Sequence, residues 1–213
     1  MMYKNFDASK LAVGELSKNR AGGNQVSLMY DERKGNIILQ TPVVSVPFGL
    51  SEYVPDGSDP KYSIDISFKG HEDNSRTAAF KRIMEDVDEH MISLGVLNSR
   101  KWFAGKALSR EVVEELYRPL VKPSKQPEKY APTLKCKIRS LSNLDAFTKE
   151  RQPFDINMLQ MGSTVKLILE FSPVWFVNKQ FGVTLNILQL EINTIPENKL
   201  SGFAFIDEDE SEQ

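Results

Sequence analysis

The sequence contains a single cysteine, Cys136, and two histidines among 213 residues. One cysteine excludes an intrachain disulfide and any zinc site built from several cysteines. No stretch approaches 18 uninterrupted apolar residues, so we expect no membrane-spanning helix. Charged residues are spread through the first 20 positions, which therefore lack the apolar core of a signal peptide. These absences lead us to expect an intracellular protein.

Signature motifs of common enzyme classes are also missing. Ala104-Gly105-Lys106-Ala107 lacks the leading glycine and the hydroxyl of a phosphate-binding loop, and neither a nucleophile elbow nor a dinucleotide fingerprint occurs. His71-Glu72-Asp73 precedes an expected helix start, where polar residues commonly cap. Asp86, Glu89 and His90 share a helical run without an identifiable partner. We therefore expect no catalytic residue, no metal and no cofactor.

Charge is distributed unevenly around a net value of −2. Residues 100–151 carry 13 Lys and Arg against 6 Asp and Glu, whereas residues 152–213 carry 3 against 9. Five of those nine acids lie in the last seven residues. A basic middle followed by an acidic end points to an anionic partner more than the overall charge does.

Hydrophobic periodicity predicts a mostly β chain with one long helix. Apolar side chains recur at three- and four-residue steps between Ser75 and Leu97, which predicts a helix, and a shorter helix is expected over 109–117 before Pro119. We expect strands over residues 25–30, 36–46, 61–70, 133–139, 163–171 and 182–192.

The connections between these elements are expected to be loops and turns. Residues 31–35 read as a hairpin turn, 51–60 as a loop, and 119–132 as an extended basic connector rich in proline. Residues 173–181 form an aromatic hairpin arm, and a slip of the apolar phase between Ile187 and Leu188 suggests a β-bulge.

This order of elements favours a small, closed or partly closed antiparallel barrel. We expect one domain over residues 1–206, in which residues 1–24 are an uncertain segment. An acidic tail over 207–213 is expected to be disordered, because so charged a run cannot bury apolar surface.

The strand that begins at Thr133 carries the clearest binding pattern. Period-two geometry places Lys135, Lys137 and Arg139 on one side, while Leu134, Cys136 and Ile138 face the core. Cations at i and i+2 lie about 6.5 to 7 Å apart, which resembles the repeat of a nucleic-acid backbone. Adjacent like charges repel unless an anion neutralises them, so a polyanion is a reasonable partner. An ordinary solvated strand face is the alternative.

Two segments mix cations with aromatic rings, as single-stranded nucleic-acid binding requires. The first runs from Arg100 to Lys106, and the second surrounds Trp175 and Phe176, whose side chains point to opposite faces of an extended segment. Burial of Trp102 or Phe103 is the alternative for the first. The DNA-contact candidates are Arg100, Lys101, Trp102, Phe103, Lys106, Lys122, Lys125, Lys129, Tyr130, Lys135, Lys137, Arg139, Trp175, Phe176 and Lys179.

The C-terminal third resembles a known family. The runs Met161–Phe171, Val174-Trp175-Phe176 and Phe181–Ile192 are similar to the last strands of OB-fold replicative single-stranded-DNA-binding proteins of tailed phages, with relatives in nucleocytoplasmic large DNA viruses. The resemblance implies an elaborated OB barrel that binds unpaired DNA without sequence preference in replication and recombination, inside an infected cell.

The same resemblance implies that the acidic tail contacts replication partners such as a polymerase or helicase and competes with DNA. The tail candidates are Asp207, Glu208, Asp209, Glu210 and Glu212. Phage tails end in an aromatic residue, whereas here Phe203 and Phe205 precede the acids.

The sequence thus favours a non-enzymatic single-stranded-DNA-binding protein. Two alternatives stay open: a β-rich scaffolding protein whose basic face binds an acidic protein, and a metal-dependent enzyme that processes nucleic acid. Exposed sheet edges would also permit a homodimer.

Overall fold

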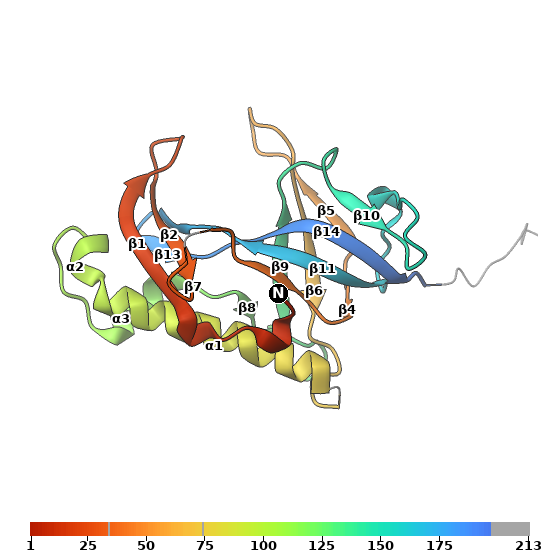
Figure 1. The fold of residues 1–213 in the computed structure, drawn as a ribbon, viewed down its shortest axis with the longest axis horizontal. Coiled ribbons are helices and arrows are strands. Elements are labelled where there is room, and N and C mark those ends of the chain that lie inside the picture. The colour runs from red at the N-terminus through yellow and green to blue at the C-terminus, as the bar shows by residue number, and fades with distance from the viewer. Residues whose placement is uncertain (34, 74, 197–213) are drawn as a thin grey trace, which may run out of the picture.

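The computed structural model describes residues 1–33, 35–73 and 75–196. Two β-sheets lie along one long helix, α1 (Ser75–Leu97), as Figure 1 shows. The expected mainly β class with one long helix is therefore confirmed. The buried side chains form one contiguous core that reaches from Tyr3 to Ile192.

Five strands of the larger sheet close into a barrel. They are β4 (Val44–Ser45), β6 (Lys61–Ser67), β9 (Thr133–Ile138), β11 (Thr164–Phe171) and β14 (Leu185–Thr194). Numbered one to five along the chain, they pair in the order 1-2-3-5-4-1, and only the third and fifth are parallel. This Greek-key order is that of an OB barrel, as expected.

Short strands extend this barrel. β3 (Ile38–Gln40) pairs with β11, β5 (Leu50–Tyr53) with β6, β8 (Val121–Lys122) with β9, and β10 (Asp145–Phe147) with β14. A 3₁₀ turn, Ile156–Met158, precedes β11. In the OB numbering, β5 lies in the loop between strands one and two.

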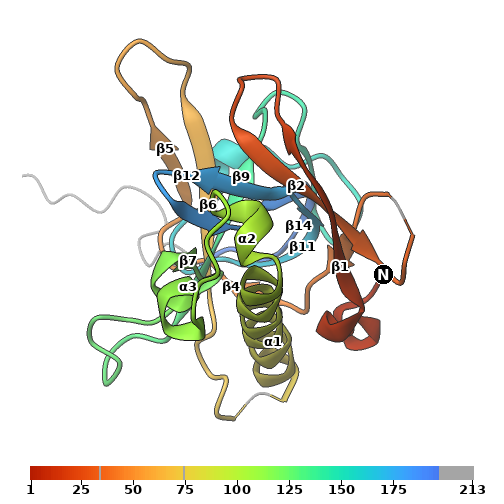
Figure 2. The same cartoon turned by 90° about the vertical axis from the view of Figure 1, so that its left-hand side faces the viewer.

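The second sheet has five strands in the order β1-β2-β12-β13-β7. They are β1 (Leu11–Lys18), β2 (Asn24–Tyr30), β12 (Val174–Val177), β13 (Gln180–Gly182) and β7 (Tyr117–Arg118). The β12–β13 hairpin is the loop between OB strands four and five, and β13 leads directly into β14. Figure 2 shows this sheet beside the helices.

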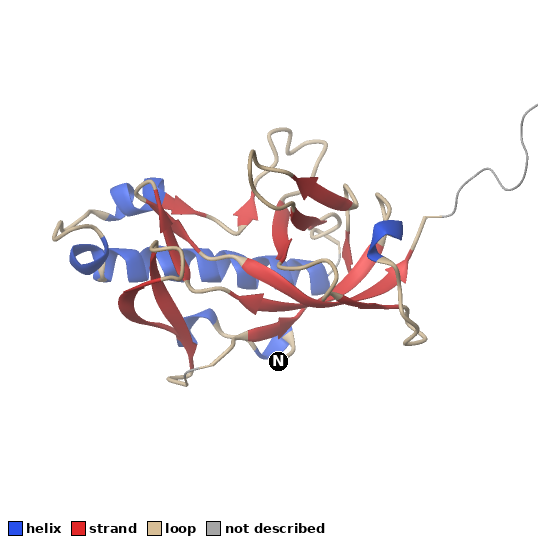
Figure 3. Cartoon of the chain, turned by 90° about the horizontal axis from the view of Figure 1, so that it is seen from above, coloured by secondary structure: helices blue, strands red, loops and turns tan. Residues whose placement is uncertain are grey.

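Helix α1 packs its apolar stripe against the strands. Phe80, Met84, Val87 and Met91 are fully buried, as their three- and four-residue spacing predicts. Two short helices follow, α2 (Ser99–Trp102) and α3 (Arg110–Leu116). Seen from above in Figure 3, strands overlie much of the length of the long helix.

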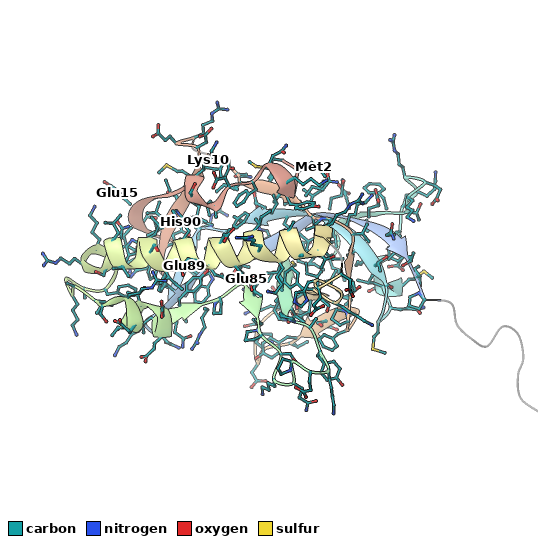
Figure 4. All side chains as sticks on the ribbon, turned by 90° about the horizontal axis from the view of Figure 1, so that it is seen from below. Met2, Lys10, Glu15, Glu85, Glu89 and His90 are labelled. Atoms are coloured by element: carbon teal, nitrogen blue, oxygen red, sulfur yellow. The ribbon has the colours of Figure 1, made fainter. Side chains whose placement is uncertain are left out.

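The N-terminal segment is part of the fold. Two 3₁₀ turns, Tyr3–Asn5 and Ala8–Lys10, bury Tyr3 and Phe6 in the core. His90 on α1, labelled in Figure 4, forms a hydrogen bond of 2.8 Å between its Nε2 and the carbonyl of Leu11. This bond ties the start of β1 to the helix.

Several expected elements differ from the structure. The single strand expected over 36–46 is two strands, because Pro42 lacks the N–H that continuous pairing needs. The two strands expected on either side of residues 31–35 do not pair, since β2 and β3 lie in different sheets. A tight turn does occur at Asp31 and Glu32, but it closes only an isolated antiparallel bridge between Tyr30 and Arg33. The loop expected over 51–60 begins with β5.

The expected β-bulge is confirmed. Ile168 of β11 pairs with Gln189, and the next residue, Leu169, pairs with Ile187. Leu188 is thus the extra residue of the bulge, at the position where the apolar phase slips.

Candidate nucleic-acid interface

The paired strands β6 and β9 turn one face to the barrel core and the other outward, and the outward face belongs to the candidate interface. Ile64 and Cys136 pair and face the barrel core, and both are fully buried. The next pairs, Ser63 with Lys137 and Asp65 with Lys135, therefore face outward. The sequence-based assignment of the two faces of β9 agrees with this arrangement.

Two of the three predicted cations on this face have acidic partners. Lys135 Nζ donates to Asp65 Oδ2 at 2.7 Å and to Ser63 Oγ at 3.3 Å. Arg139 forms an ion pair with Glu170, whose carboxylate is buried on β11. Both pairs hold their cations against the barrel wall.

Lys137 lies between these pairs and makes no ion pair with a described residue. Its pKa is lowered, first by desolvation and then by the positive charges of Lys61, Lys122 and Lys135. We call these four residues the lysine cluster. Their mutual repulsion falls when an anion binds, so the cluster favours a phosphate-rich ligand.

An exposed tyrosine, Tyr53, borders the lysine cluster. Tyr53 is 66% exposed and lies opposite Lys61 in the β5–β6 hairpin, so both side chains share the outward face. Tyr130, on the basic connector, is 64% exposed. Sequence reasoning missed Tyr53 because residues 51–60 read as loop. The turn sequence Pro55-Asp56-Gly57, followed by a strong strand, is the signal that indicates a hairpin there.

The aromatic arm is the β12–β13 hairpin, and its two large rings do face opposite sides. Phe176 stacks on Phe181 with centroids 6.1 Å apart, toward the helices. Trp175 lies over Gly182 on the other side and is partly exposed. A Cβ at Gly182 would be 2.8 Å from Trp175 Cζ2, so glycine permits this close packing.

Trp102 differs from the expectation of a stacking platform. Its side chain is only 6% exposed and packs edge-on against Phe176 at 5.4 Å and Phe181 at 5.7 Å. Phe103 also packs edge-on against Phe181, at 5.7 Å, but stays partly exposed. Neither face of the Trp102 ring is free for a base, and the tryptophan instead anchors α2.

The predicted contacts fall into two groups rather than one groove. The first group lies on the barrel face and consists of Lys122, Lys135, Lys137 and Arg139. The second group lines one pocket between α2, α3 and the β12–β13 hairpin, and consists of Lys101, Trp102, Phe103, Lys106, Phe176 and Lys179. Arg100, Lys125 and Lys129 are exposed but belong to neither group. In Figure 1, α2 and α3 lie at the end of the molecule away from β6 and β9.

Glu89 and His71, two of the residues considered for catalysis, have structural partners. Arg110 donates to both carboxylate oxygens of Glu89 at 2.6 Å, and His71 Nδ1 lies 3.0 Å from the carbonyl of Phe68. Within residues 1–33, 35–73 and 75–196, no three His, Cys, Asp or Glu side chains are arranged to hold a metal ion. No helix in that part of the chain is long and apolar enough to cross a membrane.

The predicted acidic tail, residues 207–213, lies outside the described residues.

Comparisons with known proteins give a family and several similar folds. The single-stranded DNA-binding protein from bacteriophage Enc34, solved in complex with ssDNA, is 16% identical, with 87% of this chain and 97% of that chain covered and a TM-score of 0.47. The single-stranded DNA-binding protein gp2.5 of bacteriophage T7 is 12% identical, with 78% and 98% covered and a TM-score of 0.49. No curated protein matches the chain. A family model matches residues 70–207, so the chain belongs to the family DUF5871, which is described as a family of unknown function.

Proposed function

We propose that this chain is a non-enzymatic protein that binds single-stranded DNA without sequence preference, in DNA replication or recombination. The observation that carries the proposal is the lysine cluster, which lies on OB strands two and three and on β8 beside them. OB folds bind oligonucleotides on this face and with the loops between strands one and two and between strands four and five.

The surroundings of the cluster support a single strand over a duplex. Unpaired bases stack on aromatic side chains, while cations follow the phosphates. Tyr53 lies on the loop between strands one and two, and Trp175 on the loop between strands four and five. Both loops that contact DNA in OB folds therefore carry a partly or largely exposed ring.

Contacts of this kind also account for the lack of base preference. Lysine ammonium groups contact phosphates, which carry no sequence information, and every base has a face that can stack. The acidic tail residues remain our candidates for binding replication proteins, in line with the sequence-based expectation.

The test is binding of oligo-dT by the Lys137→Glu variant across a salt series. Lys137 has no acidic partner among the described residues to lose, so reversal of its charge acts directly on the cluster. We expect affinity to fall roughly tenfold or more, and the slope of log affinity against log salt to become shallower by about 0.7 per lost phosphate contact. Anisotropy of labelled oligo-dT measures both.

Lys149→Glu is the matched control, because Lys149 is exposed and lies outside both groups of predicted contacts. Both substitutions change the net charge of the protein by the same amount. Equal losses of oligo-dT affinity for the two variants would therefore show that overall charge, and not the lysine cluster, determines binding. Absence of oligo-dT binding by the wild-type chain at low salt would refute the proposal.

A further inference from the structure

The pocket between α2, α3 and the β12–β13 hairpin has a volume of about 690 Å³. Its floor is apolar and includes Trp102, Phe103 and Phe176, with Leu108 and Leu116 beside them. Lys101, Lys106 and Lys179 also line it, and none of its described lining residues is acidic. A ligand that fits must combine apolar groups with negative charge.

The way the rings pack argues against a stacked base. Stacking requires an open ring face, but Trp102, Phe103, Phe176 and Phe181 use their faces and edges on one another. The most exposed apolar side chains of the pocket are aliphatic instead. Val177 is 56% exposed, and Leu16 and Val112 are each 40% exposed.

Exposed aliphatic side chains around an apolar floor are typical of surfaces that bind protein segments. Three lysines line the pocket and no described lining residue is acidic, so the pocket favours a negatively charged ligand. We propose that this pocket binds a peptide segment of a partner protein in which bulky apolar side chains are flanked by carboxylates. The apolar side chains would enter between Val112 and Val177, and the carboxylates would meet the lysines.

This inference does not rest on the proposed function, because no residue of the lysine cluster lines the pocket. It also gives a different role to the segment Lys101–Lys106. Its mixture of cations and rings, which the sequence suggests for DNA, would serve protein recognition.

The two tryptophans allow a direct test. Trp102 belongs to the pocket floor, whereas Trp175 lies on the opposite side of the hairpin. A Trp175→Phe chain therefore reports on the pocket alone. The probe is a fluorescein-labelled peptide of about twelve residues that alternates Asp or Glu with Leu and Phe. We expect it to bind and to change Trp102 emission.

Two control peptides separate the contributions to binding. One replaces each acid by Asn or Gln, and the other replaces each Leu and Phe by Ser. We expect both to bind at least tenfold more weakly. Equal binding of either control, or no binding of the probe at millimolar concentration, would overturn the proposal.

Protein variants locate the site. We expect Val177→Asp and the pair Lys101→Glu with Lys106→Glu to weaken the probe about tenfold, which corresponds to about 1.4 kcal/mol. Lys137→Glu and Lys149→Glu should leave probe binding unchanged. If the pocket variants weaken oligo-dT as much as the probe, the pocket belongs to a DNA path and the proposal fails.

One rival occupant is the chain's own sequence Phe203-Ala204-Phe205-Ile206, which precedes the acids. Replacement of Phe203, Phe205 and Ile206 by Ser should leave probe affinity unchanged if the occupant is a partner. A marked gain in probe affinity would show that the pocket was already filled by this segment, and would overturn the partner assignment.

Discussion

The buried carboxylate of Asp88 joins α1 to the segment between β7 and β8. It accepts hydrogen bonds from the Tyr117 hydroxyl at 2.7 Å, the Leu120 amide at 2.8 Å and the Val121 amide at 3.1 Å. We expect Asp88→Ala to lower the free energy of unfolding by roughly 3 kcal/mol, because three buried donors lose their acceptor. Urea denaturation measures the loss, and Asp86→Ala, an exposed change on the same helix, should cost far less.

Burial also raises the pKa of Asp88, although its hydrogen bonds oppose the shift. The folded chain then holds the Asp88 proton to a higher pH than the unfolded chain does. The contribution of this group to stability is complete below the ordinary pKa and is lost as pH rises through the raised value. The stability of the wild type relative to Asp88→Asn should therefore fall as pH rises through the acid range. A constant difference would contradict this assignment.

Cys136 reports on the barrel interior. Its thiol is fully buried on β9, and burial raises its pKa well above the usual range. Since the thiolate is the reactive form, we expect no labelling by a thiol reagent in native buffer and one equivalent in denaturant. Rapid labelling of the native chain would show that the barrel opens readily.

At the scale of elements, Gly95 sets how closely α1 approaches the β12–β13 hairpin. Alanine in place of glycine usually stabilises an exposed helix position by roughly 1 kcal/mol. Here a Cβ would lie 2.8 Å from both Phe181 Cζ and Val113 Cγ1. We therefore expect Gly95→Ala to lower the melting temperature, through an overpacking cost of roughly 1–3 kcal/mol. Ser93→Ala, at an exposed position two residues earlier, should leave it nearly unchanged.

Local pattern predicts the elements whose faces differ in polarity. Alternation predicts β9, three- and four-residue spacing predicts α1, and a phase slip predicts the bulge at Leu188. The same reasoning misses β5 and joins β3 to β4, because strands of two to four residues carry too few alternations to recognise. In those segments Pro42 and the turn at 55–57 are more informative than hydrophobicity.

The candidate site shows a different limit. Lys135 and Lys137 follow from the period of one strand, but Lys61 joins them only because β6 pairs with β9. Trp102 reads as a stacking ring within its own segment. Its packing partners Phe176 and Phe181 are more than 70 residues away, and no local pattern reveals them.

At the scale of the whole molecule, the chain keeps two candidate binding surfaces apart. The lysine cluster lies on the barrel, and the apolar pocket lies beside α2 and α3, although both draw on the basic stretch 100–151. A net charge of −2 conceals this separation. Binding to the two surfaces should respond to different variants.

Under the proposed function, Trp175 and Tyr53 would lie at the two ends of the DNA path. Only two residues along the chain separate Gly182, beneath Trp175, from Leu185, which pairs with Cys136 next to Lys137. Tyr53 lies beyond Lys61 on the other side of the cluster.

We expect Tyr53→Ala and Trp175→Ala each to reduce the preference for oligo-dT over an abasic strand of equal length by about 5- to 100-fold, because only bases can stack. Affinity for the abasic strand should stay unchanged, and the two losses should add because the rings are separate. Trp102→Phe is the matched control and should preserve the preference. A preference that depends on Trp102 and not on Tyr53 or Trp175 would place the bases at the pocket instead of the barrel.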